Sequence, residues 1–335
     1  MISKTALAWQ HPLPWQQILA NAVRDPAVLL DQLKLPMALL PAAQAASRQF
    51  PLRVPSGYLA RMEVGNPDDP LLRQILPLQA EMDMYADDAT DPVGDQAAMV
   101  APGVLHKYTG RVLLLVTGAC AIHCRYCFRR HFPYAEANPS TQQWQPALHY
   151  IAHDPSISEV ILSGGDPLSM SDSRLAELVA QLQVIPHVQR LRVHTRLPVV
   201  VPERVTDGLL AWLTGSRLKP VLVLHINHPN EIDAALRDAV QRLRAQQVVV
   251  LNQSVLLKGV NDDVRTLVAL SEGLFAAGIL PYYLHQLDRV QGARHFAVDA
   301  ARARSLLNEV RGRLPGYLLP RLVQEIPGMD AKLPM

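Results

Sequence analysis

The sequence predicts an α/β fold, a partial, open (β/α)6 barrel with a helical region before it and a short segment after it. Six short apolar, β-branched stretches follow one another along the chain, and amphipathic helix patterns separate most of them. Strands that alternate with helices form parallel sheets with right-handed crossovers. Polar residues also follow several of these stretches, where parallel α/β folds place their active sites. A flavodoxin-like open sheet is the alternative architecture.

The first part of the chain has helical rather than strand spacing. Apolar residues recur at helical intervals from about residue 15 to 85, interrupted by Pro36, Pro41 and Pro51. A polar, turn-rich stretch follows at 87–102. We therefore expect three parts: an N-terminal helical region and linker at 1–102, the barrel at 103–290, and a C-terminal segment at 291–335.

The barrel strands are predicted from apolar runs bounded by glycine and polar residues. The first begins at Arg111 between Gly110 and Gly118, and its continuous apolar run is typical of a strand buried on both faces. The expected strands are 112–117, 160–163, 191–195, 221–226, 248–255 and 280–285. The clearest helix patterns between them lie at 173–183 and 230–245.

Composition limits the class of protein. The chain of 335 residues is 49% hydrophobic and 19% charged, typical of a globular domain with an ample core. Lys plus Arg (32) nearly balance Asp plus Glu (30), so no large nucleic-acid surface is indicated. The first residues lack a signal peptide's apolar core, and no stretch approaches the ~20 apolar residues of a membrane span. We expect a cytoplasmic protein without a membrane partner.

The three cysteines of the chain, Cys120, Cys124 and Cys127, all lie within eight positions. Thiolates spaced C-x3-C-x2-C are suited to bind three irons of a [4Fe-4S] cluster, which normally has four cysteine ligands, so the fourth iron stays open to a small molecule. A zinc site completed by His123 or His131 is one alternative, although its short loops would be cramped. Coincidence of three buried cysteines is the other.

The cysteine segment resembles the signature of the radical S-adenosylmethionine (SAM) enzymes, with Tyr126 as the aromatic residue before the last cysteine. In that superfamily SAM chelates the open iron. A second apolar strand runs into Gly164, Gly165 and Asp166. Glycines permit close approach of a ligand, and a carboxylate suits an ammonium group, although the same residues also make an ordinary turn. The resemblance implies that these three residues contact the amino group of SAM, and that Tyr126 also lies at the cofactor.

Polar residues lie at or just after the carboxyl ends of four further predicted strands, as an active site on that face requires. Any single one is also explained as a hydrogen-bonded loop or cap residue. They are Arg196; His225, Asn227 and His228; Asn252, Gln253 and Ser254; and His285, Gln286 and Asp288.

From about residue 70 onward the chain resembles the lysine 2,3-aminomutase family, in the cysteine and glycine segments above, in His225 to Glu231, Asn252 to Gly259 and Tyr282 to Asp288, and in the final lysine. The resemblance implies a role for each matching residue. Lys332 binds pyridoxal phosphate (PLP), Arg111 lies near its phosphate, and Gln253 is a further cofactor contact. Arg129 pairs with the substrate carboxylate, while Asp288 and Glu325 receive its distant ammonium. A glutamate at 325 replaces the family's aspartate, which gives the same charge a longer reach.

The resemblance implies an isomerase that converts L-α-lysine to β-lysine with a [4Fe-4S] cluster, SAM, PLP and an external electron donor of flavodoxin or ferredoxin type. The chain stops three residues after Lys332 and has no cysteine left for a zinc site between subunits. It is therefore similar to the branch that makes (R)-β-lysine for elongation factor P and its lysyl ligase, and a homodimer is compatible with this. The alternatives are catabolic or osmolyte-forming β-lysine production, another radical SAM reaction such as methylation, and a non-enzymatic iron–sulfur or zinc module.

Overall fold

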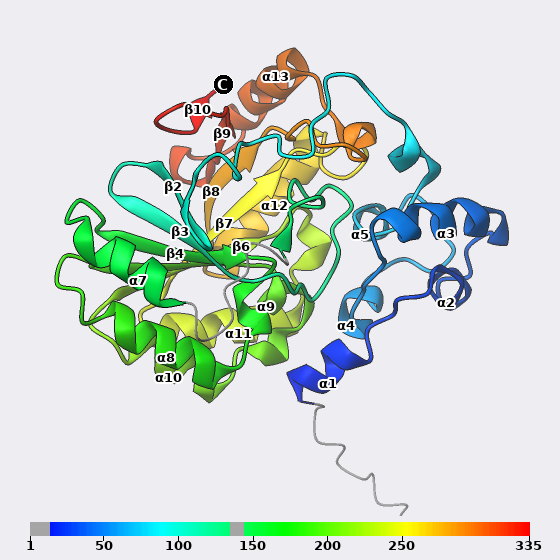
Figure 1. Cartoon of the computed structure of the whole chain (residues 1–335). Helices are drawn as coiled ribbons and strands as arrows, with labels where there is room; N and C mark the ends of the chain where they lie inside the picture. Colours follow the sequence, from blue (N-terminus) through cyan, green and yellow to red (C-terminus); the bar gives the residue numbers. More distant parts are fainter. Residues whose placement is uncertain (1–13, 135–143) are drawn as a thin grey trace, which may run out of the picture.

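The computed structural model describes residues 14–134 and 144–335, and its centre is one ten-stranded sheet (Figure 1). The strands follow one another in the sheet in chain order. Strands β3 to β9 pair parallel, whereas β1, β2 and β10 attach antiparallel at the two ends. Their bounds are β1 Met99–Ala101, β2 Val104–Tyr108, β3 Arg111–Thr117, β4 Glu159–Gly164, β5 Arg190–Thr195, β6 Lys219–His225, β7 Val249–Val255, β8 Leu280–His285, β9 Arg321–Gln324 and β10 Leu333–Pro334.

Helices connect the parallel strands and cover the sheet from outside, while the N-terminal helices form a group beside the barrel (Figure 1). The N-terminal helices are α1 Trp15–Ala20, α2 Pro26–Gln32, α3 Leu40–Gln49, α4 Ser56–Leu59 and α5 Pro70–Arg73. The barrel helices are α7 Trp144–His153, α8 Asp172–Leu182, α9 Leu197–Val200, α10 Asp207–Thr214, α11 Ala234–Ala245, α12 Val264–Ala276 and α13 Ala300–Arg311. Single 3-10 turns are η1 Met37–Leu39, η2 Gln79–Met82, η4 Pro167–Ser169, η5 Pro202–Arg204, η6 Pro229–Glu231, η7 Arg294–Phe296 and η8 Gly316–Leu318.

The six predicted barrel strands are confirmed as β3 to β8, with ends that differ by at most two residues. The sequential strand order also confirms the partial barrel and excludes the flavodoxin-like alternative, whose strand order reverses. The sheet is longer than predicted, because β1 and β2 precede it and β9 and β10 extend it. The turns around β2 need Gly103 and Gly110 at φ values of +73° and +80°, which glycine adopts without strain.

The helix predicted at 230–245 begins four residues later than expected, as α11. Asp233 is its N-cap, where the side chain accepts a hydrogen bond from the Leu236 amide. The preceding residues form η6 instead, because the fully buried Glu231 carboxylate accepts the backbone amides of Asn227 and His228. This turn carries Glu231 inward, toward the interior of the barrel.

One hydrophobic core joins the N-terminal helices to the barrel. Leu29, Leu71 and Ile75 from the N-terminal region belong to the same buried cluster as Leu191 and Leu222 of the parallel strands. A second cluster lies beneath α12 and α13 and includes residues of β8 and β9. The division at 102/103 and 290/291 stays a proposal, since the sheet extends past both boundaries. None of the helices in the described ranges has the length and apolar character needed to cross a membrane.

Candidate active site

A cavity of about 750 Å³ occupies the inside of the barrel. The cavity extends along the whole of β3, from Arg111 at the start of the strand to the cysteine loop after its end. At the usual rise of a strand this is a length of roughly 20 Å. Its volume lies in the range of small-molecule and cofactor sites. All the predicted site residues line it: Arg111, Cys120, Cys124, Tyr126, Cys127, Arg129, Gly164, Gly165, Asp166, Gln253, Asp288, Glu325 and Lys332.

The cysteine loop lies directly against the end of β4. The amide of Gly165 donates to the Thr117 carbonyl at 2.7 Å, and the amide of Asp166 donates to the Ala119 carbonyl at 2.7 Å. A Cβ atom at Gly164 or Gly165 would collide with these same carbonyl oxygens. Glycine is therefore required at both positions so that the cysteine loop can pack against the end of β4. This structural role was not predicted from the sequence.

The Asp166 side chain connects the ends of β4 and β5 through hydrogen bonds. One carboxylate oxygen accepts the Thr195 hydroxyl at 2.6 Å and the Leu168 amide at 3.1 Å, and the other accepts the Arg196 amide at 2.8 Å. Burial raises the pKa of this carboxyl in spite of these hydrogen bonds. Its predicted contact with the amino group of SAM stays a prediction, and the structure adds this bracing role.

The three cysteines are half-buried free thiols on one loop, and their sulfurs line the same cavity. Burial and the neighbouring thiols raise the pKa of Cys120, and burial together with Cys124 raises the pKa of Cys127 to about 11. Thiolates at these positions need the positive charge of bound iron, so the donor set fits an iron–sulfur cluster. Over residues 14–134 and 144–335, no three His, Cys, Asp or Glu side chains gather as ligands of a single metal ion.

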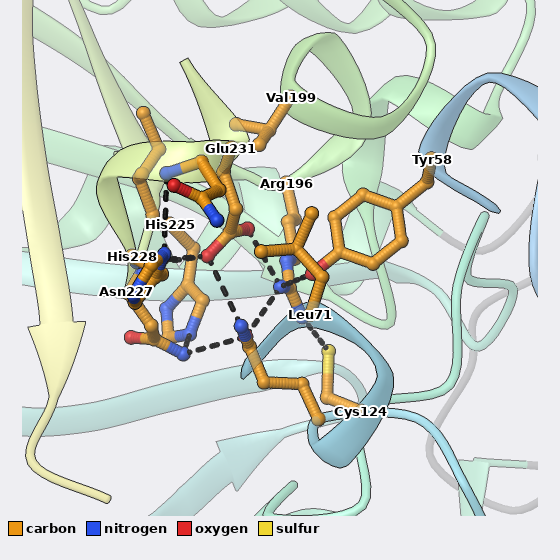
Figure 2. Close-up of polar contacts among 12 residues, drawn as sticks. Tyr58, Leu71, Cys124, Arg196, Val199, His225, Asn227, His228 and Glu231 are labelled. Carbon is orange, nitrogen blue, oxygen red and sulfur yellow. Dashed lines mark hydrogen bonds and ion pairs between the residues drawn. The ribbon is translucent and has the colours of Figure 1, made fainter. Parts of the chain in front are cut away.

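A buried arginine at the end of β5 contacts the cysteine loop (Figure 2). Arg196 Nη1 donates to Cys124 Sγ at 2.7 Å and lies 2.8 Å from the Tyr126 hydroxyl. Its Nη2 donates to three acceptors from other segments. They are the Tyr58 hydroxyl at 3.0 Å, Gln74 Oε1 at 2.7 Å and Glu231 Oε2 at 2.8 Å.

Tyr126 packs between the cysteine loop and β6. Its ring stacks on His225 with centroids 5.6 Å apart, and its hydroxyl lies 2.9 Å from His225 Nε2 and accepts from the side-chain Nδ2 of Asn227 at 2.7 Å. Burial and the nearby Arg196 charge lower the pKa of His225 to about 3, so the imidazole is neutral. The predicted aromatic residue of the motif is thus held rigidly beside the cysteines.

A chain of alternating charges lies further along the cavity, around Lys332. Lys332 Nζ forms an ion pair with Glu325, whose other oxygen accepts from Lys107 Nζ at 2.9 Å. Lys107 also pairs with Asp95 at 2.5 Å, and Asp95 accepts from Arg129 Nε at 2.6 Å. Five side chains from distant parts of the sequence, three cations and two anions, therefore alternate at this site and leave a net charge of +1.

The sequence reading missed Asp95 and Lys107. Asp95 falls in the stretch interpreted as a polar linker, and Lys107 belongs to β2, which was not predicted. A lysine within an apolar stretch next to the first barrel strand was the available signal. Among the polar residues after the strands, His225 and His285 line the cavity, whereas Asn252 and Ser254 are buried and bond to the Ile226 backbone.

The two predicted acids differ in charge state. Burial opposes ionisation of Glu325, but the ammonium groups of Lys332 and Lys107 outweigh it and lower its pKa to about 2. Burial and the neighbouring Glu325 charge raise the pKa of Asp288 to about 7. One acid of the pair is therefore ionised at neutral pH, and the other is poised to respond to a new cation.

Arg111 fits an anionic group such as a phosphate. Its guanidinium lies 4.8 Å from the Tyr108 ring centre, and no acidic side chain of the described residues forms an ion pair with it. Elsewhere along the same cavity, His194 Nε2 is buried and has no hydrogen-bond partner within the described part of the chain. Burial and the cations Arg192 and Lys332 lower the pKa of His194, so its imidazole is neutral. The cavity thus combines an amine, an unpaired guanidinium and a free imidazole nitrogen, a donor set that fits PLP.

Comparison with known proteins agrees with this geometry. Residues 108–189 match the family model of the 4Fe-4S single cluster domain, which includes the cysteine loop and the Gly-Gly-Asp segment. L-lysine 2,3-aminomutase of Escherichia coli K12 is 50% identical over 96% of this chain and 94% of its own length. The Haemophilus influenzae protein of that name is 50% identical over 95% and 94%. That of Acetoanaerobium sticklandii is 35% identical over 93% and 77%.

The chain therefore belongs to the L-lysine 2,3-aminomutase family, radical SAM isomerases whose cofactors are a [4Fe-4S] cluster, SAM and PLP.

Proposed function

We propose that this chain moves the amino group of L-lysine from the α-carbon to the β-carbon and releases β-lysine. One observation carries the proposal: a single cavity contains the cysteine loop, Lys332 and the charged groups that a diamino acid requires. The family relationship makes lysine the first substrate to test.

Cys120, Cys124 and Cys127 would bind three irons of the cluster, leaving the fourth iron for SAM. Gly164 and Gly165 line the cavity beside that place, and Tyr126 forms part of its wall. When bound, the cluster with SAM supplies a carbon radical that removes hydrogen, and PLP supplies a ring that delocalises electrons next to the migrating nitrogen.

Lys332 would bind PLP covalently, with Arg111 at the phosphate and Gln253 as a further contact. A guanidinium recognises a phosphate through two parallel hydrogen bonds, and Arg111 is the cation along this wall without an acidic partner among the described residues. A Lys332 amine bound to PLP would no longer pair with Glu325 as a free ammonium, so the Glu325 oxygen that contacts it could accept another cation.

Lysine carries a carboxylate at one end and an ammonium at the other, and the cavity offers a partner for each. Arg129 is buried and oriented by Asp95 and by Ser163, whose hydroxyl accepts from Arg129 Nη1 at 3.1 Å. Its guanidinium is therefore fixed in place to receive the carboxylate. Asp288 and Glu325 would receive the ε-ammonium, whose charge favours the ionised form of Asp288.

Anaerobic incubation of the reconstituted protein with SAM, dithionite, PLP and L-lysine, followed by chromatography of the amino acids, tests the proposal. We expect β-lysine from the wild type and none from Lys332→Ala. Cleavage of SAM without β-lysine would show a radical SAM enzyme with a different substrate. Formation of β-lysine by the variant would exclude the role of Lys332.

We further propose that the product is (R)-β-lysine and that it serves modification of elongation factor P by a separate lysyl ligase in the cytoplasm. All three cysteines lie in the cluster loop, so the sequence given has none for a zinc site between subunits. The chain also aligns with 94% of the length of the relatives at 50% identity, but 77% of the one at 35%. Chiral chromatography of the product, and mass spectrometry of elongation factor P incubated with its ligase and that product, test this. An (S) product or unmodified factor would favour the catabolic alternative.

A further inference from the structure

Among the described residues, a cationic side chain donates a hydrogen bond to the sulfur of Cys124 but not to those of the other two cysteines. Arg196 Nη1 lies 2.7 Å from Cys124 Sγ, and the Arg196 side chain is 6% exposed. We propose that Arg196 is a positioning residue that raises the reduction potential of the iron–sulfur cluster through this contact. The inference rests on the proposed cluster and goes beyond it, because it assigns a residue that governs how readily the cluster accepts its electron.

The sign follows from electrostatics. Adding an electron makes a thiolate-ligated cluster more negative, and a positive charge at a ligand sulfur stabilises that state more than the oxidised state. Hydrogen bonds to cluster sulfurs are among the factors that set the potential. Since the guanidinium is buried, solvent screens its field less than at the surface.

The rest of the network fixes the guanidinium in this orientation. The hydroxyls of Tyr58 and Tyr126 and the amide oxygen of Gln74 are neutral partners, which position Arg196 without cancelling its charge. Glu231 is the acid that pairs with it, and it binds Nη2 rather than the nitrogen that faces Cys124. Figure 2 shows Glu231 and Cys124 on different sides of the guanidinium.

Glu231 cannot readily move toward the sulfur. Its other oxygen accepts the backbone amides of Asn227 and His228 at 2.9 and 3.0 Å, and its side chain is fully buried. The acid therefore compensates the cost of burying an arginine while the positive end of the pair stays at Cys124. The geometry points to two opposing controls on the potential, a larger one from Arg196 and a smaller one from Glu231.

The test is an EPR-monitored redox titration of the reconstituted protein without SAM. Arg196→Gln should lower the equilibrium constant for reduction about tenfold, which is about 59 mV for one electron. Glu231→Gln should shift the potential in the opposite direction. Tyr58→Phe is the matched control, because it removes one hydrogen bond of Arg196 and keeps both the charge and the contact with Cys124, so its potential should equal that of the wild type.

An unchanged potential in Arg196→Gln with an intact cluster would overturn the inference, as would an equal fall in Tyr58→Phe, which would indicate general loosening. If Arg196→Gln does not bind a cluster, the Glu231→Gln variant provides the test. A raised reduction potential in Glu231→Gln would support the inference, and an unchanged potential would overturn it. Absence of iron, sulfide and the EPR signal in the wild type would instead overturn the proposed function and this inference with it.

Discussion

The two ends of the cavity are built on different principles. At the cysteine end, Arg196 is held by neutral hydroxyl and amide groups and one buried acid. At the Lys332 end, ammonium, guanidinium and carboxylate groups alternate in a chain. The first arrangement fixes one geometry, whereas the second consists of ion pairs that a charged ligand can enter and replace. The cavity thus combines a rigid end for a cluster with an exchangeable end for a substrate.

The largest expected effect on activity comes from removing one cysteine at the rigid end of the cavity. Cys127→Ala should abolish cluster binding and β-lysine formation and leave PLP bound at Lys332, because the two groups use separate side chains. Iron and sulfide content, the visible spectrum of PLP and product chromatography measure this. His131→Gln, at the exposed histidine of the zinc alternative, is the control and should retain the cluster. Loss of PLP together with the cluster would contradict the view that the two ends of the cavity bind their groups independently.

A smaller effect is expected from weakening the exchangeable end. Glu325→Gln should raise the KM for L-lysine about 10- to 100-fold, since a hydrogen bond to a charged group contributes roughly 1.5–3 kcal/mol. Steady-state kinetics of the PLP-loaded protein measures it, with Glu177→Gln on the exposed face of α8 as the control. An unchanged KM would remove Glu325 from the substrate site.

The docking of the cysteine loop on β4 has its own test. In Gly165→Ala, the new Cβ would collide with the Ala119 carbonyl, so the free energy of unfolding should fall by about 1–3 kcal/mol. Gly316→Ala is the matched control, because nothing lies within 4 Å of its Cβ position. Thermal unfolding of the cofactor-free proteins compares them. Equal melting temperatures would show that the loop does not depend on this close contact.

The smallest effect concerns pH. The pKa of Asp288 is about 7, so its carboxyl is mostly protonated at pH 6 and mostly ionised at pH 8, while Glu325, with a pKa of about 2, stays ionised. The affinity for L-lysine should therefore increase with pH over this range, by up to about tenfold per pH unit for one linked proton. Calorimetric titrations of the protein without PLP, in which Lys332 keeps the charge that acts on both acids, measure this, and Asp288→Asn should flatten the profile. If the affinity of Asp288→Asn for L-lysine still increased with pH, the pH dependence would belong to another titratable group.

The sequence predicted those parts of the molecule whose signal is local. Strands β3 to β8 appear as apolar runs, and the three cysteines lie within eight residues, so spacing alone identifies them. The link from Lys107 to Asp95 and Glu325 joins residues up to 218 positions apart in the chain, and no local pattern encodes it. Arg196 was recognised as a polar residue after a strand, but its contact with Cys124 depends on how the loop after β3 folds back toward β5.

The most direct test of the central claim, that both ends serve one reaction in one cavity, follows deuterium from the β-carbon of L-lysine. The labelled substrate is incubated anaerobically with the reconstituted protein, SAM, PLP and dithionite, and the recovered SAM and 5′-deoxyadenosine are analysed by mass spectrometry. Deuterium at the 5′-carbon, together with β-lysine, is the predicted result. Formation of β-lysine while SAM and 5′-deoxyadenosine remain unlabelled would contradict the account.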